Sequence, residues 1–322
     1  MTDPIAGLPD PYRALAGRAG EDLLRRRLLA QAGHWAHLHH QGEGLFKIEK
    51  ILPVDKFLQL GLRLSGLAGI ARKNFLGVRA VEHHWHLPRL PDALDGFRLL
   101  QLSDLHLDLD PALTPVLQEL VSSTPHDAAV VTGDYRDSTD DDPGPCLAFM
   151  RHLIPCLSPR RFGILGNHDF IEMVAPLEEA GLPILLNSHA WIEGTDGGLA
   201  VAGVDDPHFY KTHDFSRAYQ GLPQNACSIL LCHSPEAAEE AASFPSDLML
   251  CGHTHGGQIC LPGGIPLVCP VRKSMPRDRI RGAWCCGNLQ GYTSPGTGSC
   301  GVAARFHCPP EITVHILHPA KK

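Results

Sequence analysis

The chain has 322 residues, of which 43% are hydrophobic and 20% are charged, and its formal net charge at pH 7 is −7. These values are typical of a globular protein with one sizeable core and room for a small appendage. The acidic balance excludes non-specific binding to nucleic acid, which needs an excess of basic side chains to displace counterions from phosphates. We therefore expect no nucleic-acid partner.

Residues 1–75 are expected to form a helical extension. Apolar residues recur with a period near 3.6 over residues 21–40 and again over residues 55–71. The second of these helices is apolar around much of its circumference, but it is too short to span a bilayer and carries Arg63. Two alternatives remain for it. It packs on the main domain, or it lies in a membrane interface with the basic residues of 55–73 toward the headgroups.

Residues 76–322 show strands alternating with helices. Apolar runs indicate strands over residues 78–85, 97–102, 127–132, 161–165, 227–231 and 247–250, with shorter strands over 183–186, 190–193 and 199–203. Helices are expected over residues 111–122, 146–154, 171–180 and 234–242. The tail over 256–317 reads as short strands and turns, and it closes with a strand at 312–317. This order predicts a layered α/β domain over residues 76–322.

The cysteines and the first residues indicate a reducing compartment. There are eleven cysteines, an odd number, and the seven from Cys251 to Cys308 include no Cys-x-x-Cys pair. The first residues lack the basic and apolar regions of a secretory signal peptide. We expect free thiols, a cytoplasmic location, and no structural zinc site in the tail.

Five short segments carry metal-binding side chains, and each follows an apolar run. Their ligands are Asp104 and His106 in Ser-Asp-Leu-His, Asp134 in Gly-Asp-Tyr-Arg-Asp, Asn167 in Gly-Asn-His-Asp, His233 in Leu-Leu-Cys-His, and His253 with His255 in Gly-His-Thr-His. A single segment of this kind is as well explained by a turn or by a hydrogen-bonded histidine. Ligands gather beyond the carboxyl ends of strands in α/β sheets, so five such segments in succession predict one shared site.

The donor types indicate two divalent cations. Two aspartates, an asparagine and four histidines mix hard oxygen with imidazole nitrogen, which fits Mn²⁺, Fe²⁺ or Zn²⁺ better than Ca²⁺. The i, i+2 spacing of Asp104 and His106, and of His253 and His255, sends both side chains of each pair to one side. Chemistry at two such cations is mostly attack of metal-bound hydroxide on phosphorus, with a carboxylate such as Asp134 bridging the metals.

In this order, the five segments resemble the signature of the calcineurin-like metallophosphoesterases, over about residues 97–317. The tail is similar to a bacterial subgroup at 252–259, 294–298 and 309–314, although Pro295 stands where that subgroup is expected to have arginine. The subgroup includes membrane-associated phosphodiesterases and enzymes that cleave the pyrophosphate of UDP-diacylglucosamine. The resemblance implies a four-layered α/β/β/α sandwich that hydrolyses a phosphodiester or pyrophosphate bond in a small-molecule or lipid-linked substrate. The alternative is a catalytically silent binding or scaffold protein of the same fold.

Carried over position by position, the resemblance also implies roles for individual residues. Asp104, His106 and His255 would hold one metal, and Asn167, His233 and His253 the second, with Asp134 between them. His168 would protonate the leaving oxygen with support from Asp137, and Arg136 is a candidate contact for substrate phosphate. We expect a cytoplasmic enzyme, with peripheral contact at the inner face of the membrane if residues 55–73 bind lipid.

Overall fold

The first of two large β-sheets has buried central strands and a partly exposed edge strand. The computed structural model describes residues 10–39, 54–139, 142–192, 198–267, 269, 271 and 275–320. In it, the strand order of this sheet is β1-β13-β2-β3-β4. The strands are β1 (Arg79–Leu87), β13 (Glu311–Pro319), β2 (Phe97–Leu102), β3 (Ala128–Val131) and β4 (Arg161–Gly163). All of β3 is buried, as is all of β2 except Arg98, because the sheet is covered on both sides.

The second sheet has the strand order β11-β12-β8-β7-β6-β5. Its strands are β11 (Gly282–Cys286), β12 (Leu289–Thr293), β8 (Leu248–Cys251), β7 (Cys227–Leu231), β6 (Leu199–Gly203) and β5 (Ser188–Trp191). The four central strands are parallel, and the two outermost strands pair antiparallel to their neighbours. A small hairpin of β9 (Cys260–Leu261) and β10 (Ile265–Pro266) stands apart from both sheets.

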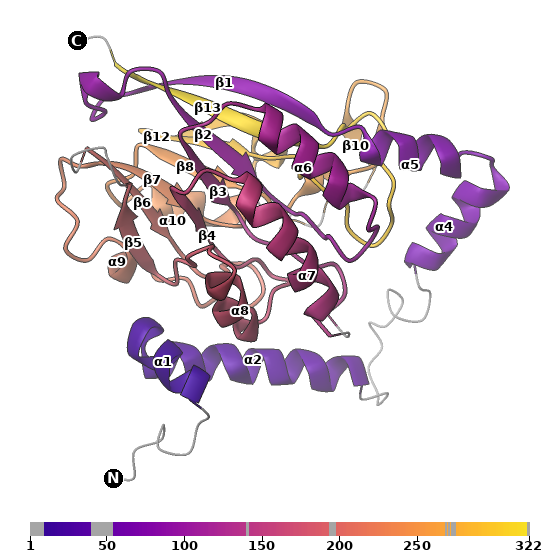
Figure 1. Ribbon diagram of the computed structural model, residues 1–322, viewed down its shortest axis with the longest axis horizontal. Coiled ribbons are helices and arrows are strands. Elements are labelled where there is room, and N and C mark those ends of the chain that lie inside the picture. Colours follow the sequence, from indigo (N-terminus) through magenta and orange to yellow (C-terminus); the bar gives the residue numbers. More distant parts are fainter. Residues whose placement is uncertain are drawn as a thin grey trace.

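Helices cover the outer face of each sheet (Figure 1). On the first sheet these are α6 (Leu113–Ser123), α7 (Gly144–Leu153) and α8 (Val174–Glu179); on the second they are α9 (Phe215–Ala218) and α10 (Ala238–Ala241). Single 3₁₀ turns occur at Asp92–Leu94, Ile154–Cys156, Ile171–Met173, Pro235–Ala237, His255–Gly257 and Arg277–Ile280. One apolar cluster lies between the sheets and one lies under each helical layer. The predicted four-layered α/β/β/α sandwich is confirmed.

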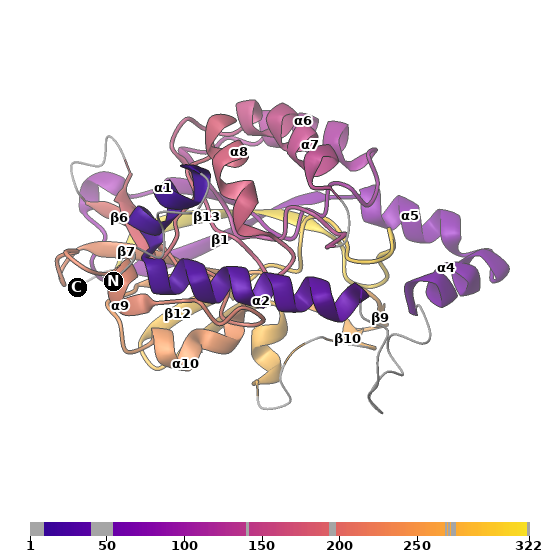
Figure 2. The ribbon, with the colours of Figure 1, turned by 90° about the horizontal axis from the view of Figure 1, so that it is seen from below.

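The N-terminal helices pack along one edge of this sandwich. Helix α1 (Asp10–Ala19) and helix α2 (Glu21–His39) lie there, and Figure 2 shows α2 crossing between the two helical layers. Leu15 and Leu24 are buried in the same apolar cluster as residues of α6, α7 and α8. The boundary at residue 75 between an extension and the main domain stays a prediction, but α1 and α2 contribute to the domain's core.

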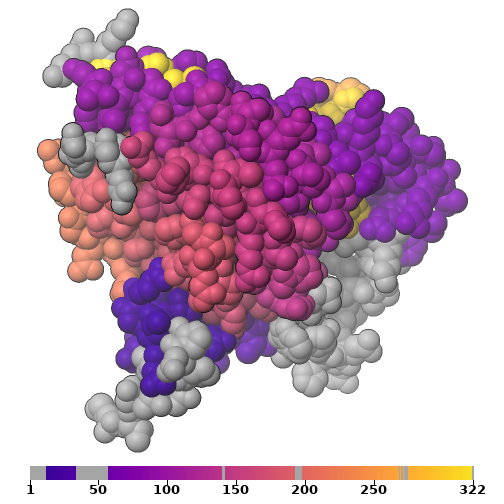
Figure 3. Space-filling view, viewed as in Figure 1, coloured from indigo at the N-terminus to yellow at the C-terminus, as the bar shows by residue number. Residues whose placement is uncertain are grey.

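The single helix predicted over residues 55–71 is wrong, because the chain turns at Gly66. Helix α4 (Val54–Leu64) ends two residues before Gly66, and α5 (Ala68–Leu76) begins two residues after it. Gly66 has a φ of 71°, which glycine adopts without the steric cost that a side chain would add. The resulting hairpin forms a lobe at one end of the molecule (Figure 3). No helix in the described ranges is long and apolar enough to cross a bilayer.

Two further strand predictions differ from the structure. Over residues 183–186, Ile184 makes only an isolated bridge to Gly163 in place of a strand, because the segment turns away from β4 directly afterward. The strand predicted over 190–193 begins earlier, as β5, and its last residue, Glu193, lies outside the described residues.

Candidate metal centre

The proposed ligands lie on loops that leave the carboxyl ends of parallel strands. Asp104 and His106 follow β2, Asp134 follows β3, Asn167 follows β4, His233 follows β7, and His253 and His255 follow β8. Gln101 of β2 donates a hydrogen bond to the carbonyl of Cys251 at the end of β8, at 3.0 Å, which ties the two sheets together beside these loops. The structure therefore gathers the five segments at one edge of the sandwich.

The backbone at these ligands is strained. Positive φ angles occur at five of the seven residues: 51° at Asp104, 42° at His106, 55° at Asp134, 71° at His253 and 50° at His255. Residues with a side chain seldom adopt this region, and the cost is on the order of 1–3 kcal/mol each. Such strain persists where the surrounding structure enforces it, which is typical of functional sites.

A first cluster of donor atoms comes from Asp104, His106, Asp134 and His255. One ligand atom from each residue lies within 4.8 Å of all the others, and all four residues are buried. The Nε2 atoms of His106 and His255 are 3.2 Å apart, and Nε2 of His255 is 3.5 Å from Oδ1 of Asp104. Nε2 of His106 is 3.8 Å from Oδ2 of Asp134.

A second cluster adjoins the first through the same carboxylate oxygen. Oδ2 of Asp134 is 3.2 Å from Nε2 of His233, which is 3.1 Å from Oδ1 of Asn167. That amide oxygen is also 2.7 Å from Nδ1 of His253. Nδ1 of His233 lies 2.7 Å from the carbonyl oxygen of Thr132, which can only accept, so Nδ1 carries a proton and Nε2 is the nitrogen that would bind a metal.

The charges at the centre are set by burial and by Asp134. Burial and repulsion from His168 lower the pKa of His106 to about 3, and burial with repulsion from His106 lowers the pKa of His255. Burial alone would lower the pKa of His233, but attraction from Asp134 raises it to about 10. Burial would likewise raise the pKa of Asp134, but attraction from His233 and His168 holds it well below its usual range. The neutral imidazoles of His106 and His255 beside the ionised Asp134 form a donor set that fits a divalent metal, and His233 joins it when it loses its extra proton.

Burial also raises the pKa of Asp104 to about 6, with repulsion from Asp134 adding to the effect and attraction from His233 opposing it. Oδ2 of Asp104 accepts a hydrogen bond from Ser103 Oγ at 2.6 Å, and Oδ1 accepts from the amide of His253 at 2.8 Å. The second bond connects the loop after β2 to the loop after β8, so that one carboxylate orders both.

Asp169, the last residue of Gly-Asn-His-Asp, holds the neighbouring loops in place. Its buried carboxylate accepts hydrogen bonds from the amides of Asp134 and Gly166, both at 2.8 Å, and from the amide of Tyr135 at 2.9 Å. Gly166 itself is required because a Cβ there would overlap the carboxylate of Asp134. These three bonds position Asp134 between the two clusters.

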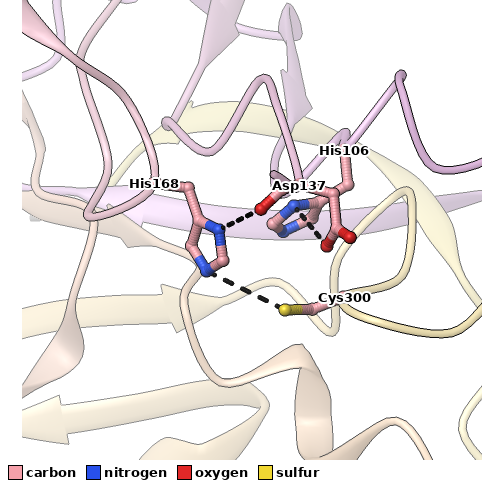
Figure 4. Close-up of side chains that lie close together, drawn as sticks. All are labelled: His106, Asp137, His168 and Cys300. Carbon is pink, nitrogen blue, oxygen red and sulfur yellow. Dashed lines mark hydrogen bonds and ion pairs between the residues drawn. The ribbon is translucent and has the colours of Figure 1, made fainter. Parts of the chain in front are cut away.

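His168 faces the site from the same loop (Figure 4). Its Nδ1 lies 2.8 Å from the backbone carbonyl of Asp137, so Nδ1 donates and Nε2 points toward Cys300, whose Sγ is 3.8 Å away. Burial would lower the pKa of His168, but attraction from Asp134 raises it well above its usual value. The support for His168 thus comes from the backbone of Asp137 rather than from its side chain.

The carboxylate of Asp137 has other contacts. Oδ1 accepts from the amide of Gly301 at 2.8 Å and is 3.4 Å from Nδ1 of His106. The carboxylate of Asp137 therefore lies near the ring nitrogen of His106 that is not in the first cluster, without a hydrogen bond to it.

Arg136 is buried behind His168. Its Nε donates to the carbonyl of His168 at 2.9 Å, and its guanidinium lies over the ring of Phe170, 4.1 Å from the centroid. The contact of Arg136 with substrate phosphate stays a prediction.

A cavity of about 470 Å³ opens over this centre. Its lining includes the polar Asp134, Asn167 and His168 together with the apolar Leu58 of α4 and Leu267 after β10. Leu58 also packs with the cluster of Ala71, Val302 and Ala304, which attaches the α4–α5 hairpin to the rim. The cavity therefore combines the buried Asp134 with apolar side chains, of which Leu267 is 57% exposed.

Several contributors were not identified from the sequence. Cys300 lines the cavity beside His168, and the ring of His208 lies 4.2 Å from that of His253 while its Nδ1 is 2.9 Å from Glu236. Neither belongs to one of the five segments, so local sequence carries no signal for them. Asp169 is the last residue of the Gly-Asn-His-Asp segment. A carboxylate so close in sequence to the ligand Asn167 is the signal that could have identified its role.

Comparison with known proteins places these residues in a family. The profile of the calcineurin-like phosphoesterases matches residues 97–257, which include all seven proposed ligands. The chain is 30% identical over 259 residues to the uncharacterized metallophosphoesterase YkuE of Bacillus subtilis, covering 74% of this chain and 85% of that protein. It is 29% identical over 230 residues to the phosphodiesterase YaeI of Escherichia coli, covering 68% and 81%. It is 24% identical over 240 residues to the UDP-2,3-diacylglucosamine pyrophosphatase LpxG of Chlamydia trachomatis, covering 58% and 71%.

Proposed function

The chain belongs to the calcineurin-like phosphoesterase family and is a metal-dependent phosphoric ester hydrolase, and on that premise we propose that it cleaves a phosphodiester or pyrophosphate bond at a centre of two divalent metals. The observation that carries the two-metal part is the position of Asp134. Its Oδ2 atom lies 3.8 Å from His106 Nε2 in one cluster and 3.2 Å from His233 Nε2 in the other.

The residues of the two clusters would divide the metals between them. Asp104, His106 and His255 would hold one, Asn167, His233 and His253 the other, and Asp134 both. Bound Mn²⁺, Fe²⁺ or Zn²⁺ would supply Lewis acidity at the phosphoryl group and activate water for attack on phosphorus. The protein's part is to fix these side chains in place by the strained loops and by Asp169.

His168 would act as the general acid. Its Nδ1 proton is engaged by the carbonyl of Asp137, so the second proton of the charged ring, on Nε2, points into the cavity. Attraction from Asp134 raises its pKa well above its usual value, which favours the protonated ring. A leaving alkoxide or phosphate oxygen near Nε2 would take that proton as the bond to phosphorus breaks.

The shape of the cavity favours a substrate with an apolar part, such as a lipid-linked nucleotide of the UDP-diacylglucosamine type. Leu58, Ile259 and Leu267 line the cavity together with the ionisable residues of the centre. The name of LpxG, a pyrophosphatase for UDP-2,3-diacylglucosamine, is consistent with this class. Apolar walls around a polar reaction centre bind the chains of such a substrate while its phosphates face the metals.

We also propose that residues 55–73 contact the inner face of the cytoplasmic membrane. The outward face of the α4–α5 hairpin exposes Phe57, Leu60, Leu64, Leu67 and Ile70, which are 40–80% accessible to solvent. Leu58 and Leu62, on the other face of α4, pack against the buried cluster of Ala71, Val302 and Ala304. One face of the hairpin therefore attaches it to the domain, and the other offers apolar side chains to a lipid interface.

The test is a panel of hydrolysis assays on the Mn²⁺-loaded protein. The panel compares an aryl phosphate monoester, an aryl phosphodiester and UDP-2,3-diacylglucosamine. We expect the diester or the lipid-linked pyrophosphate to be cleaved with a higher kcat/KM than the monoester. Preference for the monoester would refute the assigned bond type, and no turnover of any of the three would favour the scaffold alternative.

A further inference from the structure

A second cavity, of about 630 Å³, lies beside the α4–α5 hairpin and shares no lining residue with the cavity over the metal centre. It is enclosed by the end of α5, the start of β1, the turn of the β9–β10 hairpin, and the segment before β13. Figure 1 shows β10 next to α5 at this end of the molecule. Its walls carry five basic side chains and no aspartate or glutamate, and these are Lys73, Arg79, Arg281, Arg305 and His307.

Three of these five side chains are not paired directly with a carboxylate. Across the described ranges, no hydrogen bond or ion pair involves the side chains of Lys73, Arg79 or Arg281. Glu311 interacts electrostatically with Arg281 but is not hydrogen-bonded to it. The carboxylate of Glu311 accepts hydrogen bonds from the hydroxyls of Tyr292 and Thr313 instead. By contrast Arg72, the residue before Lys73, lies outside this cavity and pairs with Asp110 at 2.7 Å.

The backbone beside the cavity leaves room for the guanidinium of Arg281. The guanidinium of Arg281 extends against the β9–β10 turn, where a Cβ on Gly264 would overlap it, and the φ of Gly264 is 76°. The buried Arg305 donates from Nη1 to the carbonyls of Pro295 at 2.7 Å and His255 at 3.0 Å, so neutral oxygens satisfy these hydrogen bonds, while Asp104 and Glu311 attract its charge without forming an ion pair with it. Like charges held together in this way attract an anion, and guanidinium groups match phosphate in particular.

The elements on either side of the cavity expose large apolar residues. On one side are the five apolar residues of the α4–α5 hairpin, and on the other are Leu261, Ile265 and Leu267 of the β9–β10 hairpin, each 48–60% accessible. A phosphate site between two apolar projections is the arrangement expected at a membrane surface, where apolar side chains enter the acyl boundary and cations meet the headgroup.

We propose that this cavity binds the phosphate of an anionic phospholipid headgroup while the two hairpins insert beside it. The inference rests on the proposed membrane contact and assigns it a lipid charge and a binding site. It also predicts how the protein is oriented on the membrane, because the β9–β10 hairpin borders both cavities. Gly263 and Gly264 line the basic cavity, and Leu267 lines the cavity over the metal centre. A headgroup held here places the mouth of the catalytic cavity at the lipid surface.

The test is co-sedimentation of the full chain with vesicles of phosphatidylglycerol or of phosphatidylcholine at low salt. We expect binding to phosphatidylglycerol, and weak binding to phosphatidylcholine. A basic residue at an anionic surface contributes about a fivefold factor in affinity, so Lys73→Ala/Arg79→Ala/Arg281→Ala is expected to weaken phosphatidylglycerol binding roughly 100-fold. The control Arg25→Ala/Arg26→Ala/Arg151→Ala removes three exposed cations elsewhere and the same net charge, and we expect it to stay within about fivefold of wild type. Circular dichroism checks that both variants are folded.

Each other result overturns the inference in a distinct way. Equal losses in the two triple variants would mean that net charge, and not the cavity, drives binding. Unchanged binding of the cavity variant would leave the apolar faces as the whole contact. Cavity-dependent binding of glycerol 3-phosphate in calorimetry, without preference for anionic vesicles, would make this a site for a free phosphate compound. Failure to bind either vesicle would refute the membrane contact itself, whereas the proposed hydrolysis is judged separately by the substrate panel.

Discussion

Replacing Arg27 is expected to reduce both the stability of the fold and the order of the metal centre. Arg27 projects from α2 and is fully buried. Its Nη1 is 3.3 Å from Oδ1 of Asp205, its Nη2 donates to the carbonyl of Asp169 at 2.7 Å, and its Cζ lies 3.4 Å from the centroid of the Tyr210 ring. Through Asp169, this one side chain connects the N-terminal helix to the loop that orders Asp134.

The magnitude follows from what Arg27→Ala leaves behind. Asp205 is fully buried as well, and removing one partner of a buried ion pair costs about 3–5 kcal/mol because the other charge stays uncompensated. With an unfolding entropy of about 2.1 cal/mol/K per residue, that loss lowers the unfolding temperature of a chain of this size by about 4–7 °C. We expect the metal content at limiting Mn²⁺ to fall in the folded protein too, because Asp169 loses a contact.

Thermal unfolding and metal analysis of the variant measure both effects. Arg25→Ala, an exposed position on the same helix, is the matched control and should change the unfolding temperature by less than 1 °C or so, as surface substitutions do. Arg27→Ala/Asp205→Asn should recover part of the loss, since it removes the unpaired charge. A shift for Arg27→Ala no larger than that for Arg25→Ala would refute the reasoning.

Three further predictions concern the centre itself. Asp134→Asn should abolish turnover and lower the metal content, since its carboxylate adjoins both clusters; wild-type hydrolysis with full metal occupancy would contradict this. His168→Ala should keep its metals and slow cleavage by about 10²–10⁴, with a smaller loss for substrates that have good leaving groups. Equal losses for good and poor leaving groups would exclude His168 as the acid. Metal binding at pH 7 should release about one proton per chain, because the pKa of His233 is about 10 without metal and its Nε2 must be deprotonated to bind one. Calorimetry in buffers of different ionisation enthalpy measures that proton, and release that stays the same up to pH 11 would contradict the assignment.

The sequence was sufficient to predict the alternation of strands and helices and the ligand segments, for a local physical reason, whereas the four layers were implied by the family resemblance. Buried strands such as β3 are apolar on both faces, and ligands placed directly after such strands meet wherever the strands are parallel. Neither feature depends on knowing the rest of the chain.

The missed features depend on contacts between distant segments. Cys300 reaches His168 across 132 positions, and Arg27 reaches Asp169 across 142, so no spacing rule connects either pair. The support of His168 by the backbone of Asp137 is invisible in a sequence for a different reason, because every residue has the same carbonyl. The break at Gly66 was readable in principle, but the apolar period continues through it.

The most direct test of the two-metal account is a titration of the chelator-treated protein with Mn²⁺, in which bound metal and hydrolysis of an aryl phosphodiester are measured on the same samples. The account predicts that hydrolysis rises with the second equivalent of bound metal and reaches its maximum near two per chain. Full hydrolysis with one metal bound, or in excess chelator with none, would contradict it.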